Sequence, residues 1–260
     1  MPLARVSTAE MGDTYYGLVA EGYDTYLAQV DFGDLECWRS LLREANGPAL
    51  ELACGTGRLL LPLRAEGHTV EGLDASAEML AICRAKLAAR RLDATLHHAA
   101  MENLSLPTRY GAIFCAAGSL SLLTSEAAQR QVLCASLRHL GAGGIAAFAM
   151  FDATPPGSPG RRLRREGRRP DGAVHRVWEE RLANPTPGVE ARRMTHEIVV
   201  DGEVVATETG TASWRPLAPA ALAAMLAEVG FAEVRVTDRS GTVTAPEDIS
   251  DYVVVGKSRH

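Results

Sequence analysis

The chain has 260 residues, 47% of them hydrophobic and 23% charged, which is the balance of an ordinary globular protein. Its net charge of -5 at pH 7 argues against a protein that binds nucleic acid through a broadly basic surface. No apolar run approaches the ~20 residues that cross a bilayer, and residues 1–16 lack the apolar stretch of a signal peptide. The five cysteines are dispersed and form no C-x-x-C pair, so we expect free thiols in a cytoplasmic protein, without disulfides or a metal site.

The first 45 residues are predicted to be helical. Tyrosines and aliphatic residues recur at three- and four-residue steps over residues 14–27, which predicts an amphipathic helix. A second helix is predicted over residues 34–45, and it ends at the stop signal Asn46-Gly47-Pro48.

Strands and helices then alternate up to residue 151. The predicted strands are residues 48–53, 69–73, 94–98, 112–117 and 145–151, and the predicted helices are residues 58–66, 77–90 and 125–140. This alternation is typical of a parallel sheet that is covered by helices on both faces.

The pattern changes after residue 151. Residues 154–160 are rich in proline and glycine and predict a loop. Residues 174–213 predict antiparallel strands, with Asp201-Gly202 as a hairpin turn. A helix is predicted from Pro219, and strands over residues 232–238 and 252–257. We therefore expect an α/β core that is interrupted by a β-rich insertion over residues 152–214.

The most informative segment is residues 49–57, where an apolar strand runs into small residues and then into a helix. Such a loop lets the backbone approach a ligand closely, and the helix N-terminus offers free N–H groups. Asp74 ends the next predicted strand, where a carboxylate can bind both hydroxyls of an adenosine ribose. A dinucleotide loop would need a third small residue where this chain has Leu60, which disfavours a nucleotide-dependent oxidoreductase.

Residues 50–87, LELACGTGRLLLPLRAEGHTVEGLDASAEMLAICRAKL, resemble the first two motifs of class I methyltransferases that depend on S-adenosylmethionine (SAM). The resemblance covers residues 12–151 well and the last 45 residues in outline. It implies an α/β fold: a Rossmann-like, seven-stranded, mostly parallel sheet with helices on both faces, whose last strand, residues 252–256, inserts antiparallel. It also implies a single methyltransferase domain, with an N-terminal helical lid (residues 1–46), a SAM-binding core (47–151), a β-rich substrate-side insertion (152–214) and a C-terminal part of the core (215–260).

The same resemblance implies roles for individual residues. Glu51 would hold the methionyl ammonium, the two glycines would line the methionine and ribose, and Asp74 would bind the ribose. Met79 would pack on the adenine or, equally, in the core, and the tyrosines would cover the methionine end or, equally, pack in the core. The predicted cofactor-binding residues are Tyr16, Tyr23, Glu51, Ala53, Gly55, Gly57, Asp74, Ala75, Met79, Ala100, Met101, Glu102 and Ala116.

Two positions depart from the family pattern. Ala53 stands where the first glycine of E-x-G-x-G-x-G is expected, and Ala100 stands where an aspartate often receives the adenine amino group. The backbone N–H of Met101, or the side chain of Glu102 or Asn103, would have to serve the adenine instead. The neighbouring pair of histidines at residues 97 and 98 is expected to end a strand rather than to bind a metal.

The sequence says less about the residues that bind the methyl acceptor. Residues 119–123 lack the histidine that many small-molecule N-methyltransferases carry there, so no general base is inherited. His175 and His196 are the weak candidates for a base, and Trp178 and Arg215 are candidates for acceptor binding. Strand alternation predicts two faces, one with His175, Val177 and Glu179 and the other with Arg176, Trp178 and Glu180.

Six arginines between residues 161 and 169 form the strongest charge feature. We expect a solvated loop there, and the alternative is capture of a carboxylate or phosphate on the acceptor.

The expected function is methyl transfer from SAM to the amine or hydroxyl of a small-molecule substrate, with S-adenosylhomocysteine (SAH) as the product. No nucleic acid or membrane partner is expected, and a homodimer is left open. The alternatives are an RNA methyltransferase that grips its substrate with the arginines, and a SAM-binding enzyme without transferase activity, such as a cyclase.

Overall fold

The computed structural model describes residues 5–7, 15–28, 30–151, 160–243 and 251–259, and they fall into two compact units. The described residues within Met1–Asp31 and Pro155–Trp214 form the smaller unit. Those within Phe32–Thr154 and Arg215–His260 form the larger unit.

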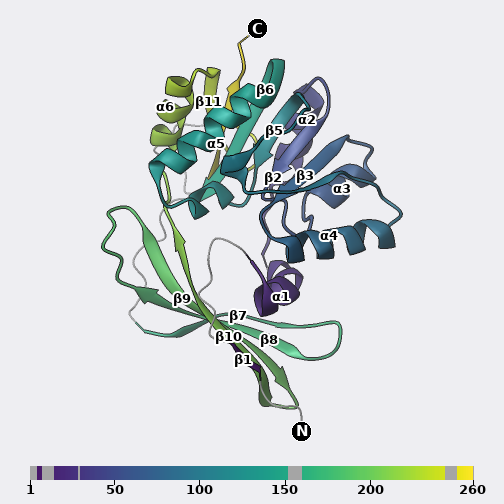
Figure 1. Ribbon diagram of the computed structural model, residues 1–260, viewed down its shortest axis with the longest axis vertical. Helices are drawn as coiled ribbons and strands as arrows, with labels where there is room; N and C mark the ends of the chain where they lie inside the picture. The colour runs from purple at the N-terminus through teal and green to yellow at the C-terminus, as the bar shows by residue number, and fades with distance from the viewer. Residues whose placement is uncertain (1–4, 8–14, 29, 152–159, 244–250, 260) are drawn as a thin grey trace. The chain divides into compact units, whose positions relative to one another are not determined.

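The larger unit is built on a seven-stranded sheet (Figure 1). Its strands are β2 (Ala49–Leu52), β3 (Val70–Asp74), β4 (Leu96–His98), β5 (Tyr110–Cys115), β6 (Leu140–Phe151), β11 (Ala232–Asp238) and β12 (Asp251–Lys257). They lie in the order β11-β12-β6-β5-β2-β3-β4. The pairs β2–β3, β3–β4, β2–β5 and β5–β6 are parallel, whereas β12 runs antiparallel to both β6 and β11. The predicted mostly parallel sheet with an antiparallel last strand is therefore confirmed.

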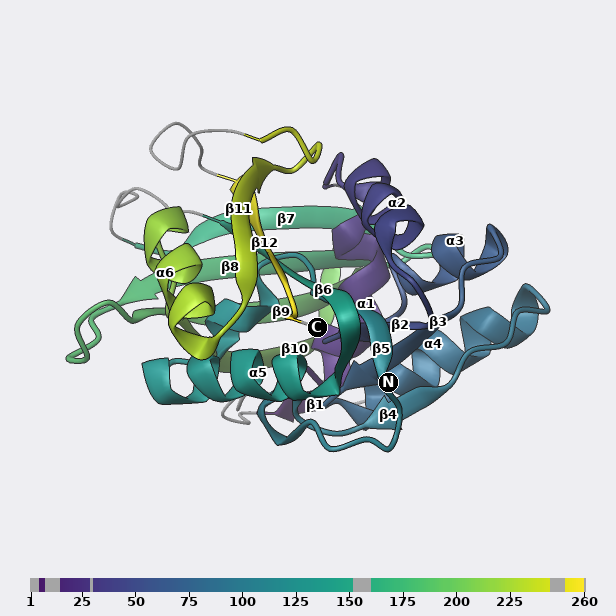
Figure 2. The same cartoon turned by 90° about the horizontal axis from the view of Figure 1, so that it is seen from above.

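Helices cover this sheet on both faces (Figure 2). They are α2 (Leu35–Glu44), α3 (Leu60–Ala65), α4 (Ala77–Ala89), α5 (Glu126–His139) and α6 (Pro219–Val229). The strand β5 shows why two layers form, because successive side chains of a strand point to opposite faces. Phe114 packs with Trp38 of α2, with ring centroids 5.0 Å apart, while Ile113 belongs to a second cluster with Leu133 of α5.

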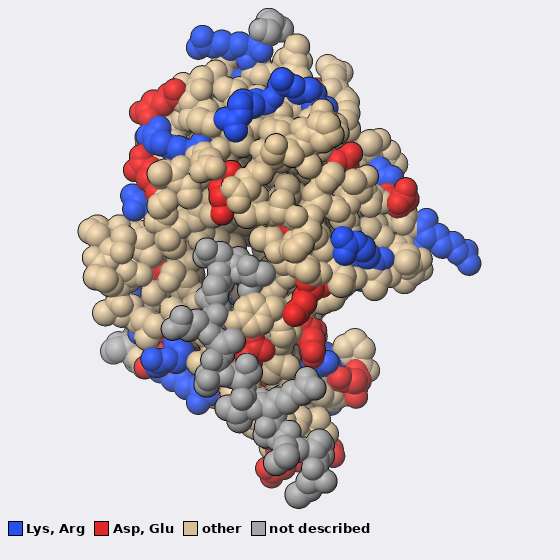
Figure 3. Space-filling model, in the orientation of Figure 1, with Lys and Arg blue, Asp and Glu red and all other residues tan. Residues whose placement is uncertain are grey.

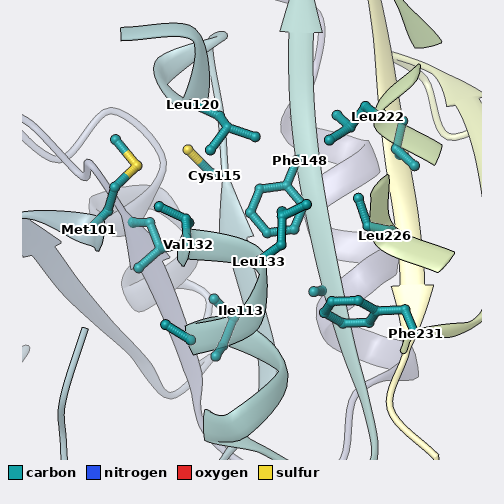
Figure 4. Close-up of a cluster of buried hydrophobic side chains, with 14 of the residues drawn as sticks. Met101, Ile113, Cys115, Leu120, Val132, Leu133, Phe148, Leu222, Leu226 and Phe231 are labelled. Carbon is teal, nitrogen blue, oxygen red and sulfur yellow. The ribbon is translucent and has the colours of Figure 1, made fainter. Parts of the chain in front are cut away.

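The second cluster is drawn in Figure 4, where Phe148 of β6 lies beside Leu133 of α5 and Leu226 of α6. Each of these three side chains is fully buried. Burying a side chain of this size stabilises a fold by about 1.5–3 kcal/mol. The apolar runs that predicted these elements are thus the residues that hold α5 and α6 on the sheet.

Short 3₁₀ helices that the sequence did not predict follow two of the strands. They are η1 (Met101–Asn103), after β4, and η2 (Ser119–Leu122), after β5. Two of the longer helices begin at serine caps, since Ser76 Oγ accepts from the N–H of Met79 and Ser125 Oγ from the N–H of Ala128.

The smaller unit is a five-stranded sheet with one helix, α1 (Gly17–Leu27), lying against it (Figure 1). Its strands are β1 (Arg5–Ser7), β7 (Arg162–Arg168), β8 (Val174–Leu182), β9 (Glu190–Val200) and β10 (Glu203–Trp214), in the order β1-β10-β9-β8-β7. The pairs among β7 to β10 are antiparallel, and Asp201 and Gly202 have the positive φ of the predicted hairpin turn. The β-rich insertion is therefore confirmed within residues 160–214, and residues 154–159 of the predicted loop lie outside the described residues.

Two predictions were wrong in this unit. The first 45 residues are not all helical, because β1 adds a parallel strand to the edge of β10. A strand of three residues has no periodicity of its own and depends on its partner. The arginine-rich segment is a strand, β7, rather than a loop, because its arginines find carboxylate partners on the neighbouring strand. The predicted helix over residues 14–27 begins at Gly17, and Thr14 lies outside the described residues.

Within the described part of the chain, no helix is both long and apolar enough to cross a bilayer.

Candidate functional site

The loop that leaves β2 has a backbone that few residues adopt. Ala53, Gly55 and Gly57 have φ angles of 53°, 55° and 86°, all in the left-handed region. A Cβ atom on Gly57 would lie 2.0 Å from Cδ1 of Leu61, so glycine is required there for packing as well as for conformation. Ala53 has a left-handed backbone conformation, which costs an alanine about 1–2 kcal/mol. This position of the loop therefore has a conformation that glycine adopts more readily.

Asp74, at the end of β3, fastens this loop to the next helix. Its Oδ2 accepts a hydrogen bond from the N–H of Gly55 and its Oδ1 from the N–H of Ser76, each at 2.8 Å. Burial raises the pKa of Asp74, and these backbone N–H groups oppose that shift without cancelling it. The carboxylate lies at the carboxyl ends of the strands, where ligands bind in open α/β sheets.

Glu51, on β2 itself, is a buried carboxyl group that is 3% exposed. Its Oε2 has no hydrogen-bond partner among the residues that the structure describes. Burial raises the pKa of Glu51 to about 8, although the positive charge of Arg58 lowers it in part. A buried polar atom without a partner is costly, and a cationic ligand group would satisfy it. The predicted site residues Glu51, Gly55 and Asp74 are thus brought together around one loop.

Arg58 and Asp34 form a partly buried ion pair beside the loop, and the sequence did not predict this pair. The guanidinium of Arg58 donates to both oxygens of Asp34, at 2.7 and 2.8 Å, and Trp38 Nε1–H donates to Asp34 Oδ2 at 2.9 Å. Burial alone would raise the pKa of Asp34, but the bonds and charge of Arg58 and the bond from Trp38 lower it. The guanidinium also stacks 3.9 Å above the ring centre of Phe32. This pair joins α2 to the residue that directly follows Gly57.

The paired histidines end β4, as predicted. His98 Nε2 lies 2.9 Å from the carbonyl oxygen of Ala75, and His97 Nε2 lies 2.8 Å from Oε2 of Glu71. No group of three or more potential metal-binding side chains occurs among the described residues. The contact with His98 thus fixes the carbonyl group of Ala75, the residue that directly follows Asp74.

The side chains predicted to lie near the adenine are mostly buried. Met79 is 1% exposed, Met101 is 9% exposed and packs in the cluster of Figure 4, and Ala116 packs in the other cluster. Ala100 precedes the 3₁₀ helix η1, whose first N–H groups have no acceptor within that helix. The carbonyl oxygen of Glu102 accepts from Gln131 Nε2. The adenine contacts of these residues stay predictions.

Tyr16 and Tyr23 belong to the smaller unit. Tyr16 directly precedes α1, and the ring of Tyr23 stacks on Tyr26, with ring centres 6.2 Å apart, and meets the ring of Tyr15 edge-on at 5.5 Å. Packing within a tyrosine cluster is therefore part of the role of Tyr23, and covering the cofactor stays a prediction for both tyrosines.

The two histidines proposed as weak candidates for a base lie together. His175 Nε2 is 3.1 Å from His196 Nδ1, and both side chains are buried on the same face of the sheet. Burial lowers the pKa of both rings, that of His196 to about 3, where the charge of His175 adds to the effect. A ring with so low a pKa is a poor proton acceptor at pH 7.

Trp178 lies on the opposite face of β8, as strand alternation predicted. Its Nε1–H donates to Glu197 Oε2 at 2.7 Å, and the guanidinium of Arg161 lies 4.6 Å from its ring centre. His175, Val177 and Glu179 form the buried face. The structure therefore does not bring Trp178 together with the histidines.

Arg215 belongs to the larger unit, where its backbone joins η2 and α5. Its N–H donates to the carbonyl oxygen of Ser121 at 2.7 Å, and its own carbonyl oxygen accepts from Gln129 Nε2 at 3.1 Å. Its guanidinium lies 3.8 Å from Glu126. A role in acceptor binding stays a prediction.

Comparisons with known proteins agree with this geometry. Residues 49–144 match a family model described as a methyltransferase domain. A dTDP-3-amino-3,6-dideoxy-alpha-D-glucopyranose N,N-dimethyltransferase of Streptomyces fradiae is 45% identical over 78 residues, which are 30% of this chain and 29% of that protein. A dTDP-3-amino-3,4,6-trideoxy-alpha-D-glucopyranose N,N-dimethyltransferase of Streptomyces venezuelae is 30% identical over 140 residues, 54% of this chain and 55% of that protein. The chain thus matches about half or less of the length of these two relatives.

Solved structures share the fold over a longer stretch. The CcbJ methyltransferase from Streptomyces caelestis superposes with a TM-score of 0.76 at 23% identity, covering 96% of this chain and all of that one. The strand order, the glycine loop and the family match together identify residues 49–144 as a methyltransferase domain of the class I, SAM-dependent type.

Proposed function

We propose that this chain is an enzyme that transfers a methyl group from SAM to the amine of a small molecule. The observation that carries the proposal is Glu51, a buried carboxyl group beside the glycine loop whose Oε2 lacks a partner among the described residues. The methionine part of SAM has an ammonium group, which would supply the missing hydrogen-bond donor and positive charge. Asp74, at the neighbouring strand end, would accept hydrogen bonds from the ribose hydroxyls.

Bound SAM would supply an electrophilic methyl group on a positively charged sulfur. The residues of this chain would bind and orient it: the backbone at Gly55 and Gly57 would allow close approach, and Glu51 would fix the methionine end. Packing against Leu61 fixes Gly57 and the bond to Asp74 fixes Gly55, which would hold the loop in place for the cofactor. Such alignment is the main requirement for a methyl transfer.

An amine is favoured over a hydroxyl as the acceptor. A neutral amine presents its lone pair without a base, whereas a hydroxyl must lose its proton in the reaction. His175 and His196, the weak candidates for a base, have lowered pKa values. The two relatives in Streptomyces act, by their names, on amino sugars joined to dTDP. We therefore propose an amino sugar as the acceptor class.

Isothermal titration calorimetry with SAM, SAH and NAD tests the cofactor. We expect micromolar affinity for SAM and SAH and none for NAD, and Asp74→Ala should weaken SAM binding at least tenfold, about 1.4 kcal/mol. Unaltered SAM affinity in that variant would remove Asp74 from the site. If the wild-type protein bound no SAM at all, the proposed function would have to be abandoned.

Two alternatives make different products or complexes. A cyclase that holds SAM as structure would form no SAH during turnover, so SAH production from an amino sugar separates the two. An RNA methyltransferase would bind RNA with a strong salt dependence. On the face drawn in Figure 3, acidic and basic side chains are interspersed, which does not favour RNA. A homodimer stays a prediction, which light scattering checks.

A further inference from the structure

The buried face of the sheet in the smaller unit carries four arginines, three of which bond to one glutamate. We call this group the arginine face, and it consists of Arg162, Arg164, Arg165, Arg192 and Glu179. Glu179 Oε1 accepts from Arg162, and Glu179 Oε2 accepts from Arg164 at 2.5 Å and from Arg192 at 2.8 Å. The carboxylate is 3% exposed, so the arginines converge on a buried point.

A β-bulge places two successive arginines on this face. In a regular strand Arg164 and Arg165 would point to opposite faces, but the pairing of β7 with β8 shifts register between Leu163 and Arg165. Both side chains consequently approach Tyr26 of α1: Arg164 by a hydrogen bond, and Arg165 with its guanidinium 5.6 Å from the ring centre. Bulges commonly re-aim side chains next to functional sites.

The arginine face has more positive than negative charge. Burial would raise the pKa of Glu179, but the bonds and charges of Arg192, Arg164 and Arg162 lower it to about 2, so the carboxylate is ionised at pH 7. Glu190, 3.4 Å from Arg192, adds a second negative charge. Three guanidinium groups therefore pair with these two carboxylates, and Arg165 adds a fourth positive charge to the same face.

One further carboxylate lies on the same face but is engaged elsewhere. Glu208 Oε2 accepts from the N–H of Leu18 at 2.8 Å, in the first turn of α1, where the helix dipole favours a negative charge. Its Oε1 is buried and has no hydrogen-bond partner among the described residues, so the face holds four guanidinium groups and three carboxylates.

Arg165 is the arginine with the fewest bonds in this group. Its Nε is buried and has no hydrogen-bond partner among the residues that the structure describes, and its Nη1 makes one long contact, 3.5 Å, with the carbonyl oxygen of Arg164. At the open edge of the group, the side chains of Arg162 and Arg164 are 53% and 31% exposed. Solvent therefore reaches a cluster that already holds donors and excess positive charge.

We propose that the arginine face binds an oxyanion, a phosphoryl or carboxylate group of a small molecule. The planar fork of arginine donors fits the oxygens of either group. Arg165 is the specificity-determining residue of this site.

Calorimetry on the full chain tests the proposal with two probes, inorganic pyrophosphate and succinate. Arg165→Gln removes one of the four positive charges of the arginine face. Arg161→Gln is the matched control, since Arg161 pairs with Glu197 on the opposite face of the same sheet. We expect one of the probes to bind the wild-type protein, and at least a tenfold loss in Arg165→Gln against less than twofold in Arg161→Gln. The probe that binds shows whether the group is phosphoryl or carboxylate.

If neither probe binds the wild-type protein, the proposal is overturned. Equal losses in the two variants would also overturn it, because they would indicate non-specific attraction by surface charge. Thermal unfolding of both variants shows whether the fold is kept, and Arg165→Lys, which keeps the charge, should restore part of the affinity. SAM affinity of Arg165→Gln separates the two proposals. If SAM still binds but neither probe does, only the oxyanion site is wrong, whereas absent SAM binding by the wild-type protein contradicts the proposed function itself.

Discussion

The two units bury polar groups in different places. In the larger unit the sheet is enclosed by apolar side chains such as Leu133 and Phe148, and its buried carboxylates Glu51 and Asp34 lie near the glycine loop. In the smaller unit the middle of the sheet itself is polar, with Glu179 and Arg192 buried where a core would ordinarily be aliphatic.

This difference follows from how each sheet is covered. The larger unit can bury its polar groups at strand ends, because two layers of helices already stabilise it. The smaller unit has one helix on its buried face, and its stability depends on ion pairs that are costly to desolvate and costly to break. A sheet that keeps arginines and histidines in its interior is consistent with a binding surface, and variants can test whether the two units differ in this way.

The largest effect is expected at Glu179. Glu179→Ala would leave Arg192, 92% buried at its side chain, without its main partner, and should lower the free energy of unfolding by about 3–5 kcal/mol. The neighbouring Glu180 pairs with Arg193 on the exposed face, so Glu180→Ala should cost less than about 1 kcal/mol. Urea unfolding followed by tryptophan fluorescence measures both. Equal effects would mean that the buried pair is no more important than a surface pair.

The next effect is expected in the glycine loop of the larger unit. Gly57→Ala should destabilise by about 3 kcal/mol, because strain at φ 86° adds to a clash of the new Cβ with Leu61. Gly67→Ala is the matched control: its φ is 89°, and a Cβ there would meet no atom within 4 Å, so about 1 kcal/mol of strain is expected alone. Urea unfolding of the two variants measures the difference, and equal losses would exclude the packing contribution.

A smaller and pH-dependent effect is expected at His196. Its pKa is lowered to about 3 in the folded chain, below the ~6.5 of an unfolded one, so the unfolded chain binds more protons between these values. Stability should therefore fall as the pH decreases from 7, and at pH 5 this ring should account for about 2 kcal/mol. His196→Gln should lose less stability between pH 7 and pH 5 than the wild-type protein, as urea unfolding at both values measures.

An identical pH dependence in the wild-type protein and in His196→Gln would show that the buried histidine pair does not titrate during unfolding.

The sequence predicted the larger unit far better than the smaller one. Its strands and helices depend on local apolar periodicity and on serine and glycine signals such as Ser76 and Gly57, and nearly every element is where these residues predict it. The positions of the site residues could be predicted for the same reason, since Gly55 and Asp74 are adjacent to the ends of predicted strands.

The elements that the sequence missed depend on partners distant along the chain. The strand β1 exists through pairing with β10, and β7 is ordered by bonds from its arginines to Glu179. The bulge that joins Arg164 and Arg165 on one face is a matter of register between two strands, which no local pattern encodes. The pair of Arg58 and Asp34 lay beside a recognised motif, but 24 residues separate the two charges.

The parallel pairing of β1 with β10 also has a consequence for biosynthesis. Arg5 lies opposite Ala206, so roughly four-fifths of the chain must leave the ribosome before the edge of this sheet can close. Until then β1 has no partner strand, whereas β2 to β6 can already assemble, because the segments that form them are neighbours in the chain. Contacts this distant along the chain close slowly. The smaller unit is therefore expected to fold last, and its folding is expected to be the step at which misassembly occurs most readily.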